Sequence, residues 1–198
     1  PTKNKPTLAF SIDFEGFVED CKNAVKGPDS RDVISELVER AVSSPSELLA
    51  AIGEPTKAGV NKVHVSDDLT ILNLVWGPEM DLYPHNHEMW AVIGLYGGRE
   101  DNTFWRRNEG RLDRHGTKVM ETGDVSTLGH DVIHSVKNPL ARLTGALHVY
   151  GGDFFETPRS EWDAETLTEA AYSVPAALAM FEASNERWVE LQKEKAAG

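Results

Sequence analysis

The chain contains 198 residues, of which 40% are hydrophobic and 26% charged, the composition of an ordinary globular protein with its own apolar core. The formal net charge of −12 repels phosphate backbones and anionic lipid, so we expect neither nucleic acid nor a membrane surface as a partner. The single cysteine, Cys21, excludes an internal disulfide. Since no apolar stretch reaches the roughly 20 residues of a membrane span and no signal-peptide pattern opens the sequence, we expect a cytoplasmic protein.

The N-terminal segment, residues 6–55, is predicted to be helical. Apolar residues recur at helical spacing between residues 11 and 25 and again between residues 33 and 42. A third helix is predicted after Ser44, which can cap its first turn. Cys21 lies on the apolar face of the first helix, and we interpret it as a core residue rather than a nucleophile.

Residues 57–155 are predicted to form β-structure. Short runs rich in β-branched and aromatic residues are separated by turn signals such as Gly97-Gly98 and Asn138-Pro139. Seven or so strands with no helical interruption favour a sandwich or barrel over alternating strands and helices. Residues 160–198 are predicted to be a helical segment, and the whole chain is predicted to be one mainly β domain flanked by helices.

Histidine carries the most specific signal. His85 and His87 flank Asn86, and on a strand two residues at this spacing point to the same face, where both imidazoles can bind one metal ion. The alternative is two histidines on a polar strand face. His134 lies in a later segment with two glycine turns, and Asn138 follows it four residues on.

Together these segments resemble the two-part signature of the cupin superfamily, over roughly residues 69–155. The resemblance implies a double-stranded β-helix barrel and three metal ligands: His85, His87 and His134. Most metal-binding cupins add a glutamate four or five residues after the second histidine, where this chain has Ala91 and Val92. We therefore expect a site of three neutral imidazoles, and because structural zinc sites normally have four protein ligands, such an open site indicates catalysis.

Three-histidine cupins include the thiol dioxygenases, and the sequence is similar to the cysteine dioxygenase and 3-mercaptopropionate dioxygenase families further along. These families carry a histidine and a tyrosine two residues apart on a late strand, as His148 and Tyr150 are here. The family serine two residues before that histidine is replaced by Ala146. In the mercaptopropionate type an arginine eleven residues after the histidine binds the substrate carboxylate, and Arg159 stands at that spacing.

Two further departures separate the chain from cysteine dioxygenase itself. The cysteine-specific arginine has no counterpart in residues 63–74, and the cysteine that crosslinks to the tyrosine is replaced by Val92. The resemblance thus implies an Fe(II) dioxygenase that uses O2 to oxidise a small carboxylated thiol to its sulfinic acid. Imidazole ligands also suit other metals, so Zn, Ni or Mn can occupy the site in a purified sample. Cupins often pair through barrel faces, so the resemblance allows a homodimer.

Several alternatives stay open at this stage. Another three-histidine cupin dioxygenase, of the diketone type, would cleave carbon–carbon bonds and give Arg159 no carboxylate to bind. A zinc or manganese isomerase, or a non-enzymatic cupin that binds a small molecule at its metal, would share the same three histidines. Tyr150 and His148 can instead be core residues, and Arg159 can form a surface ion pair with Glu161.

Overall fold

The structure of the protein, a computed structural model, describes residues 12–109 and 111–197; residues 6–11 of the predicted N-terminal segment, and residue 198, lie outside it. The described residues form four helices: α1 (Phe14–Ala24), α2 (Ser30–Val42), α3 (Pro45–Ile52) and α4 (Val174–Ala197). They also form eleven strands: β1 (Gly59–Val65), β2 (Thr70–Trp76), β3 (Asp81–Asn86), β4 (Ala91–Gly97), β5 (Arg99–Asn108), β6 (Arg111–Glu121), β7 (Val125–Leu128), β8 (Ile133–Lys137), β9 (Thr144–Tyr150), β10 (Ser160–Trp162) and β11 (Glu169–Ala171).

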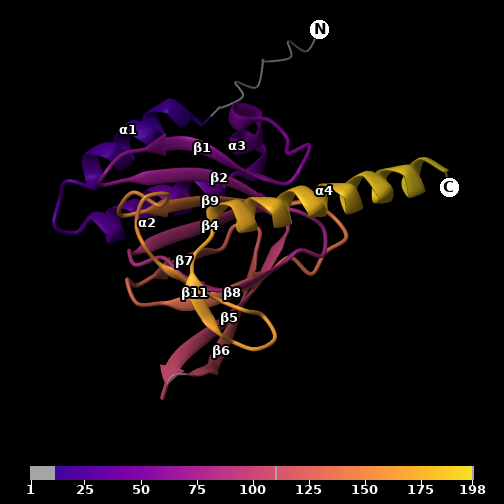
Figure 1. Cartoon of the computed structure of the whole chain (residues 1–198). Coiled ribbons are helices and arrows are strands. Elements are labelled where there is room, and N and C mark those ends of the chain that lie inside the picture. The colour runs from indigo at the N-terminus through magenta and orange to yellow at the C-terminus, as the bar shows by residue number, and fades with distance from the viewer. Residues whose placement is uncertain (1–11, 110, 198) are drawn as a thin grey trace, which may run out of the picture.

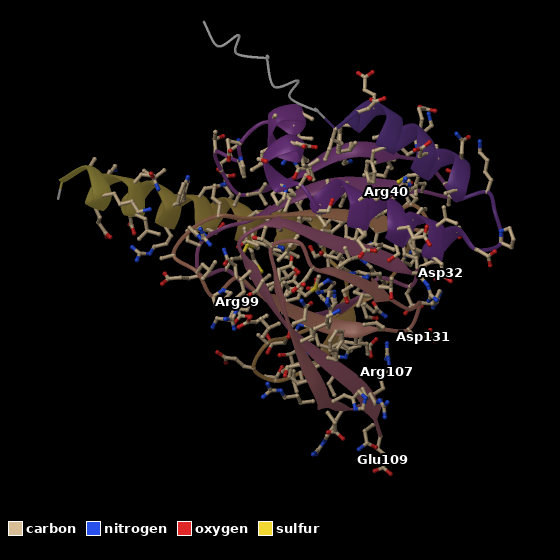
Figure 2. The ribbon with its side chains drawn as sticks, turned by 180° about the vertical axis from the view of Figure 1, so that it is seen from behind. Asp32, Arg40, Arg99, Arg107, Glu109 and Asp131 are labelled. Carbon is tan, nitrogen blue, oxygen red and sulfur yellow. The ribbon has the colours of Figure 1, made fainter. Side chains whose placement is uncertain are left out.

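The strands make two antiparallel sheets. Sheet A has the order β1-β2-β9-β4-β7, and sheet B has the order β11-β10-β3-β8-β5-β6. From β2 to β9 the chain passes alternately from one sheet to the other, with only the β5–β6 hairpin staying in sheet B, and this is the winding of a double-stranded β-helix (Figure 1). The predicted fold class is therefore confirmed. The β5–β6 hairpin projects beyond the barrel, with Glu109 at its tip (Figure 2).

Helices α1, α2 and α3 cover the outer face of sheet A (Figure 1). Their fully buried side chains, such as Ile34 and Leu48, pack against outward-facing strand residues that include Ile71 and Val149. Because the inner face of sheet A is also covered, every residue of β9 is buried. Cys21 lies in this helix–sheet core, and burial raises the pKa of its thiol to about 12, so it is a packing residue as predicted.

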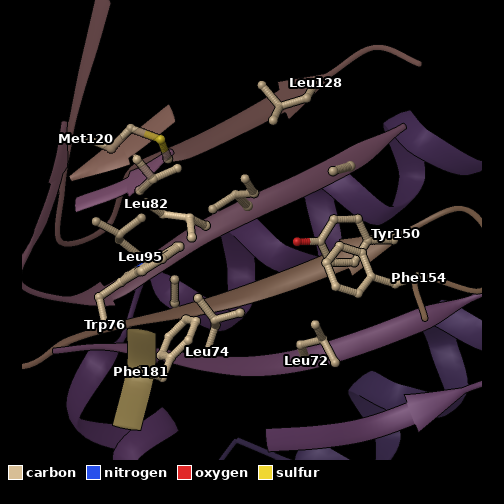
Figure 3. Close-up of a cluster of buried hydrophobic side chains, with 14 of the residues drawn as sticks. Leu72, Leu74, Trp76, Leu82, Leu95, Met120, Leu128, Tyr150, Phe154 and Phe181 are labelled. Carbon is tan, nitrogen blue, oxygen red and sulfur yellow. The ribbon is translucent and has the colours of Figure 1, made fainter. Parts of the chain in front are cut away.

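The inner faces of the two sheets enclose a second apolar core (Figure 3). Alternate residues of β2 point inward, so Leu72, Leu74 and Trp76 lie in this core while Ile71 faces the helices. Helix α4 contributes Phe181, whose ring stacks on that of Trp76 with centroids 5.3 Å apart. The C-terminal helix thus adds its apolar stripe to the barrel interior.

The C-terminal segment differs from the sequence expectation in its first part. Residues 160–171 were expected to be helical, but they contain strands β10 and β11, which extend sheet B beside β3 before α4 begins at Val174. Three-residue strands are too short to show a period of two, so their pairing is set by the neighbouring strand rather than by the local pattern. No helix in the described residues is both long and apolar enough to cross a bilayer.

Candidate metal centre

Strands β3 and β8 bring the three histidines together. His85 on β3 and His134 on β8 are direct cross-strand partners, and His87 follows the last residue of β3. One ring nitrogen of each lies within 4.8 Å of the others, and all three side chains are buried. The structure thus places together the residues that the sequence resemblance singled out, while their role as ligands stays a prediction.

Hydrogen bonds fix which ring nitrogen of two of these histidines is free. His85 Nδ1 lies 3.1 Å from the carbonyl oxygen of Tyr83, and His134 Nδ1 lies 2.9 Å from Oδ1 of Asn102. Since both partners are acceptors, each Nδ1 must carry the hydrogen, and each Nε2 is left with a bare lone pair. Outer partners of this kind orient metal-binding histidines, and sequence reasoning did not identify Asn102 in that role.

The arrangement of the free nitrogens fits a cation. Nε2 of His134 and Nε2 of His87 are 3.3 Å apart, and His87 Nδ1 is buried with no hydrogen-bond partner in the described part of the chain. Two ligands each about 2.0–2.1 Å from one ion can have this separation. A cation bound between the rings would be coordinated by both Nε2 atoms in place of the contact between them, so the donor set fits a metal ion.

Burial keeps all three imidazoles neutral. Loss of water lowers the pKa of His85 to about 4, partly opposed by its hydrogen bond to Tyr83, and holds the pKa values of His87 and His134 well below their usual range. Neutral imidazole is the form that binds a metal. The site is therefore ready to bind a cation at neutral pH without first releasing protons.

These shifts predict an acid-sensitive metal-free protein. Between pH 6.5 and pH 5 the unfolded chain takes up a proton on His85 and the folded protein does not, so the free energy of unfolding should fall by about 1.5 kcal/mol from this residue alone. Urea unfolding of the metal-free protein at the two pH values measures the loss. The variant His85→Gln should show a smaller loss, and an equal pH dependence in the two proteins would contradict the assignment.

Within the described residues the histidine cluster includes no carboxylate. Ala91 points into the barrel core, so the position where most metal-binding cupins carry a glutamate offers no ligand atom. Val92 faces the helices instead. Glu88 lies in the turn after β3, where it is partly exposed, accepts a hydrogen bond from Asn86 Nδ2 and is not part of the histidine cluster.

Sheet A supplies the opposite wall of the site. His148 and Tyr150 alternate on β9 and both point inward, where Tyr150 stacks edge-on to His87 with ring centroids 5.1 Å apart. The hydroxyl of Tyr150 lies 2.9 Å from His148 Nδ1. Burial raises the pKa of Tyr150, so its phenol keeps its proton. These two residues lie beside the histidine cluster, as the resemblance implied.

A small cavity of about 40 Å³ lies between this wall and the three imidazoles. At roughly 10–15 Å³ for each water on this measure, it has room for about three water molecules. Apart from the histidines and two tyrosines its walls are apolar or aromatic, with Trp76, Phe154 and Phe181 among them. Figure 3 shows Phe154 against the ring of Tyr150, whose hydroxyl points toward the barrel interior.

The aromatic rings of Phe154 and Tyr172 lie between Arg159 and the cavity beside the histidine cluster. Its guanidinium is sandwiched between the rings of Phe154 and Tyr172, 4.0 Å from each centroid, and both rings line the cavity. Arg159 itself is not part of the cavity wall. Only 8% of the residue is exposed, and Nη1 donates to the backbone carbonyl of Phe154. The surface ion pair with Glu161 considered from the sequence is not among the salt bridges of the described residues.

No protein-family model matches the sequence. The structure is similar to a cupin family protein of double-stranded β-helix fold from Methanocaldococcus jannaschii, with 11% identity, a TM-score of 0.43, and coverage of 52% of this chain and 86% of that one. It is also similar to an uncharacterised protein with a double-stranded β-helix domain from Klebsiella pneumoniae (11% identity, TM-score 0.37, 61% and 88% coverage). A variant of oxalate decarboxylase from Bacillus subtilis is 20% identical with a TM-score of 0.41, over 52% of this chain and 27% of that one. The double-stranded β-helix is established by the strand order of this chain's own two sheets, and the proteins it is similar to include cupins.

Proposed function

We propose that the protein is a mononuclear non-haem Fe(II) dioxygenase that oxidises a small carboxylated thiol, such as 3-mercaptopropionate, to its sulfinic acid. The main support for this proposal is that Arg159, a buried cation close to a three-histidine cluster, has guanidinium nitrogens without a hydrogen-bond partner in the described part of the chain. Within the described residues its Nε and Nη2 are buried and have no hydrogen-bond partner. Such donors indicate a ligand with two acceptor oxygens, and a carboxylate is the group that matches a guanidinium best.

The position of Arg159 also suits an anionic substrate electrostatically. The chain carries a formal charge of −12, so the long-range field opposes the approach of an anion and a local cation is needed to bind one. Stacking on Phe154 and Tyr172 stabilises the guanidinium without neutralising it. Arg159 lies behind the rings of Phe154 and Tyr172 rather than in the cavity wall, so it would hold the carboxylate end of a substrate whose other end reaches the histidines once these rings shift to admit it.

His85, His87 and His134 would hold the iron, which when bound supplies the redox chemistry that adds both atoms of O2 to the thiol sulfur. The remaining residues position and protect the reactants. Tyr150 presents its hydroxyl beside His87 and forms a hydrogen bond with His148 Nδ1, so it can hydrogen-bond a reacting sulfur or oxygen atom. The apolar walls restrict water, and the small cavity favours a substrate of only a few heavy atoms.

Oxygen uptake by the anaerobically Fe(II)-loaded protein tests the proposal directly. We would offer 3-mercaptopropionate, cysteine, mercaptosuccinate and a diketone in parallel and measure products. Uptake matched by sulfinate from a carboxylated thiol is the expected result. Uptake with the diketone alone would replace thiol oxidation by carbon–carbon cleavage, and no uptake despite bound iron would favour a protein that binds its ligand without turnover.

Substitution of Arg159 should separate substrate binding from metal binding. Arg159→Gln removes two charge-assisted hydrogen bonds to a carboxylate, so we expect kcat/KM for the thiol to fall by about 10²–10³-fold, mainly through KM, with metal content unchanged. Arg159→Lys keeps the positive charge but not the planar guanidinium that donates two parallel hydrogen bonds, so its kcat/KM should fall less than that of Arg159→Gln. Arg107, on the projecting β5–β6 hairpin and ion-paired with Glu169, is the control for removing a cation (Figure 2). Equal kinetics in Arg159→Gln and Arg107→Gln would contradict the assignment.

A further inference from the structure

Glu100 is a buried carboxylate beside the site that the proposed chemistry does not use. It lies two residues from Asn102 on β5, so both side chains point into the barrel. Glu100 is fully buried, and its Oε1 accepts a hydrogen bond of 2.6 Å from Nε1 of Trp76. In the part of the chain that the structure describes, Oε2 has no hydrogen-bond partner.

A carboxylate shielded from water needs a proton or a nearby positive charge. The basic group that faces Glu100 is His148, whose Nε2 lies 3.8 Å from Oε1. His148 is itself 3% exposed, and its Nε2 also has no hydrogen-bond partner among the described residues. Within the described residues, a buried carboxylate whose Oε2 is unpaired therefore lies beside a buried imidazole whose Nε2 is unpaired, with Oε1 as the oxygen nearest Nε2. The pair is stabilised if His148 carries a hydrogen on both ring nitrogens, because the imidazolium then supplies the positive charge that the carboxylate needs.

The presence of that additional proton on His148 decides the direction of the hydrogen bond between His148 Nδ1 and the Tyr150 hydroxyl. If His148 carried a hydrogen on Nε2 alone, its Nδ1 would accept the hydroxyl hydrogen of Tyr150, 2.9 Å away, and turn it from the cavity. If His148 carries the additional proton, both of its ring nitrogens hold a hydrogen, Nε2 beside Glu100 and Nδ1 beside Tyr150. Nδ1 then donates to the Tyr150 oxygen, and the Tyr150 hydrogen is free to point at the histidine cluster.

We propose that Glu100 is a positioning residue that keeps a hydrogen on His148 Nδ1, so that Tyr150 donates its hydroxyl into the cavity. Glu100 acts through His148 and does not touch the reactants. The inference rests on the proposed function only for the use made of the Tyr150 hydrogen. The direction of the His148–Tyr150 hydrogen bond follows from buried groups alone and holds whatever the substrate is.

Nitrogen NMR of the imidazoles tests this directly. In zinc-loaded protein labelled with 15N-histidine, long-range 1H–15N spectra distinguish protonated from unprotonated ring nitrogens, and the variant His148→Asn identifies the His148 signals. We expect a protonated Nδ1 in the unsubstituted protein. In Glu100→Gln, the Trp76 N–H holds the amide oxygen at the position facing His148, so Nε2 donates to that oxygen and Nδ1 loses its hydrogen. Glu121→Gln, on the exposed end of β6, is the control and should leave the signals unchanged.

An unprotonated Nδ1 in the unsubstituted protein, or a protonated one in Glu100→Gln, would overturn the inference. If Glu100→Gln does not fold, the spectrum of the unsubstituted protein decides the question alone. The oxygen-uptake experiment tests the function separately. A protonated Nδ1 without thiol oxidation would reject the proposed function and keep the role of Glu100, whereas thiol oxidation with an unprotonated Nδ1 would do the reverse.

Discussion

Replacing His134 with alanine is expected to weaken metal binding by more than about 100-fold and to abolish turnover, while the barrel stays folded. The change removes one of three ring nitrogens that lie within 4.8 Å of one another. Loss of an outer hydrogen-bond partner alone typically costs roughly 10–100-fold in metal affinity, so loss of a ligand must cost more. Metal content by elemental analysis and helix and strand content by circular dichroism measure the two outcomes.

The stability cost of this variant should be modest. Truncation leaves Asn102 Oδ1 without its donor in a buried position, which we expect to lower the free energy of unfolding by about 1–3 kcal/mol. Two apolar clusters hold the fold independently of the site. His130→Ala is the matched control, since His130 lies four residues earlier and has 60% of its side chain exposed beside Asp131. If His134→Ala does not fold, the metal has a structural role. If the variant retains its full metal content, His134 is not a ligand.

Replacing Tyr150 with phenylalanine is expected to lower kcat by about ten- to a thousandfold, with the metal content unchanged. The ring that carries this hydroxyl lies edge-on to His87 with centroids 5.1 Å apart, and one hydrogen bond made in the transition state is worth roughly this factor. Phenylalanine keeps the ring that packs on Phe154, so the cavity wall should keep its shape. Steady-state kinetics of the Fe(II)-loaded variant with the thiol substrate provide the measurement.

Tyr96→Phe provides the comparison for this effect. Tyr96 is equally buried, but its hydroxyl donates to Asn73 on the side of sheet A that faces the helices. We expect Tyr96→Phe to lose a little stability and to keep its turnover number. If both variants lose activity to the same degree, Tyr150 acts through packing rather than through its hydroxyl.

Much of the fold could be predicted because local patterns follow from burial on one or two faces. Helices α1 and α2 bury a single stripe against sheet A, so their apolar residues recur at helical spacing. The barrel strands are bounded by turn residues and rich in β-branched side chains. The same reasoning missed β10 and β11, because three residues are too few for any period and β3, the strand on which β10 pairs, lies far away in the sequence.

The candidate site was predictable only in part. His85 and His87 could be predicted from the sequence because their spacing places both rings on one face of a strand. His134, His148 and Tyr150 were identified through the family resemblance. The sequence allowed two interpretations of Arg159, as the residue that binds the substrate carboxylate or as a surface residue ion-paired with Glu161. Its burial between two aromatic rings is a tertiary property that no spacing expresses.

The amino-acid sequence by itself determined the mainly β character, the flanking helices and the histidines that make a metal site conceivable, because each depends on side chains close together along one element. The tertiary structure alone decided what surrounds those histidines. It brings Asn102 to His134 and buries the charge of Arg159. It also places Glu100 beside His148, near which the thiol dioxygenase families carry a serine that Ala146 replaces here. Hydrogen-bond direction, desolvation and unpaired charge depend on which strands meet across the barrel, and that pairing is a property of the folded chain.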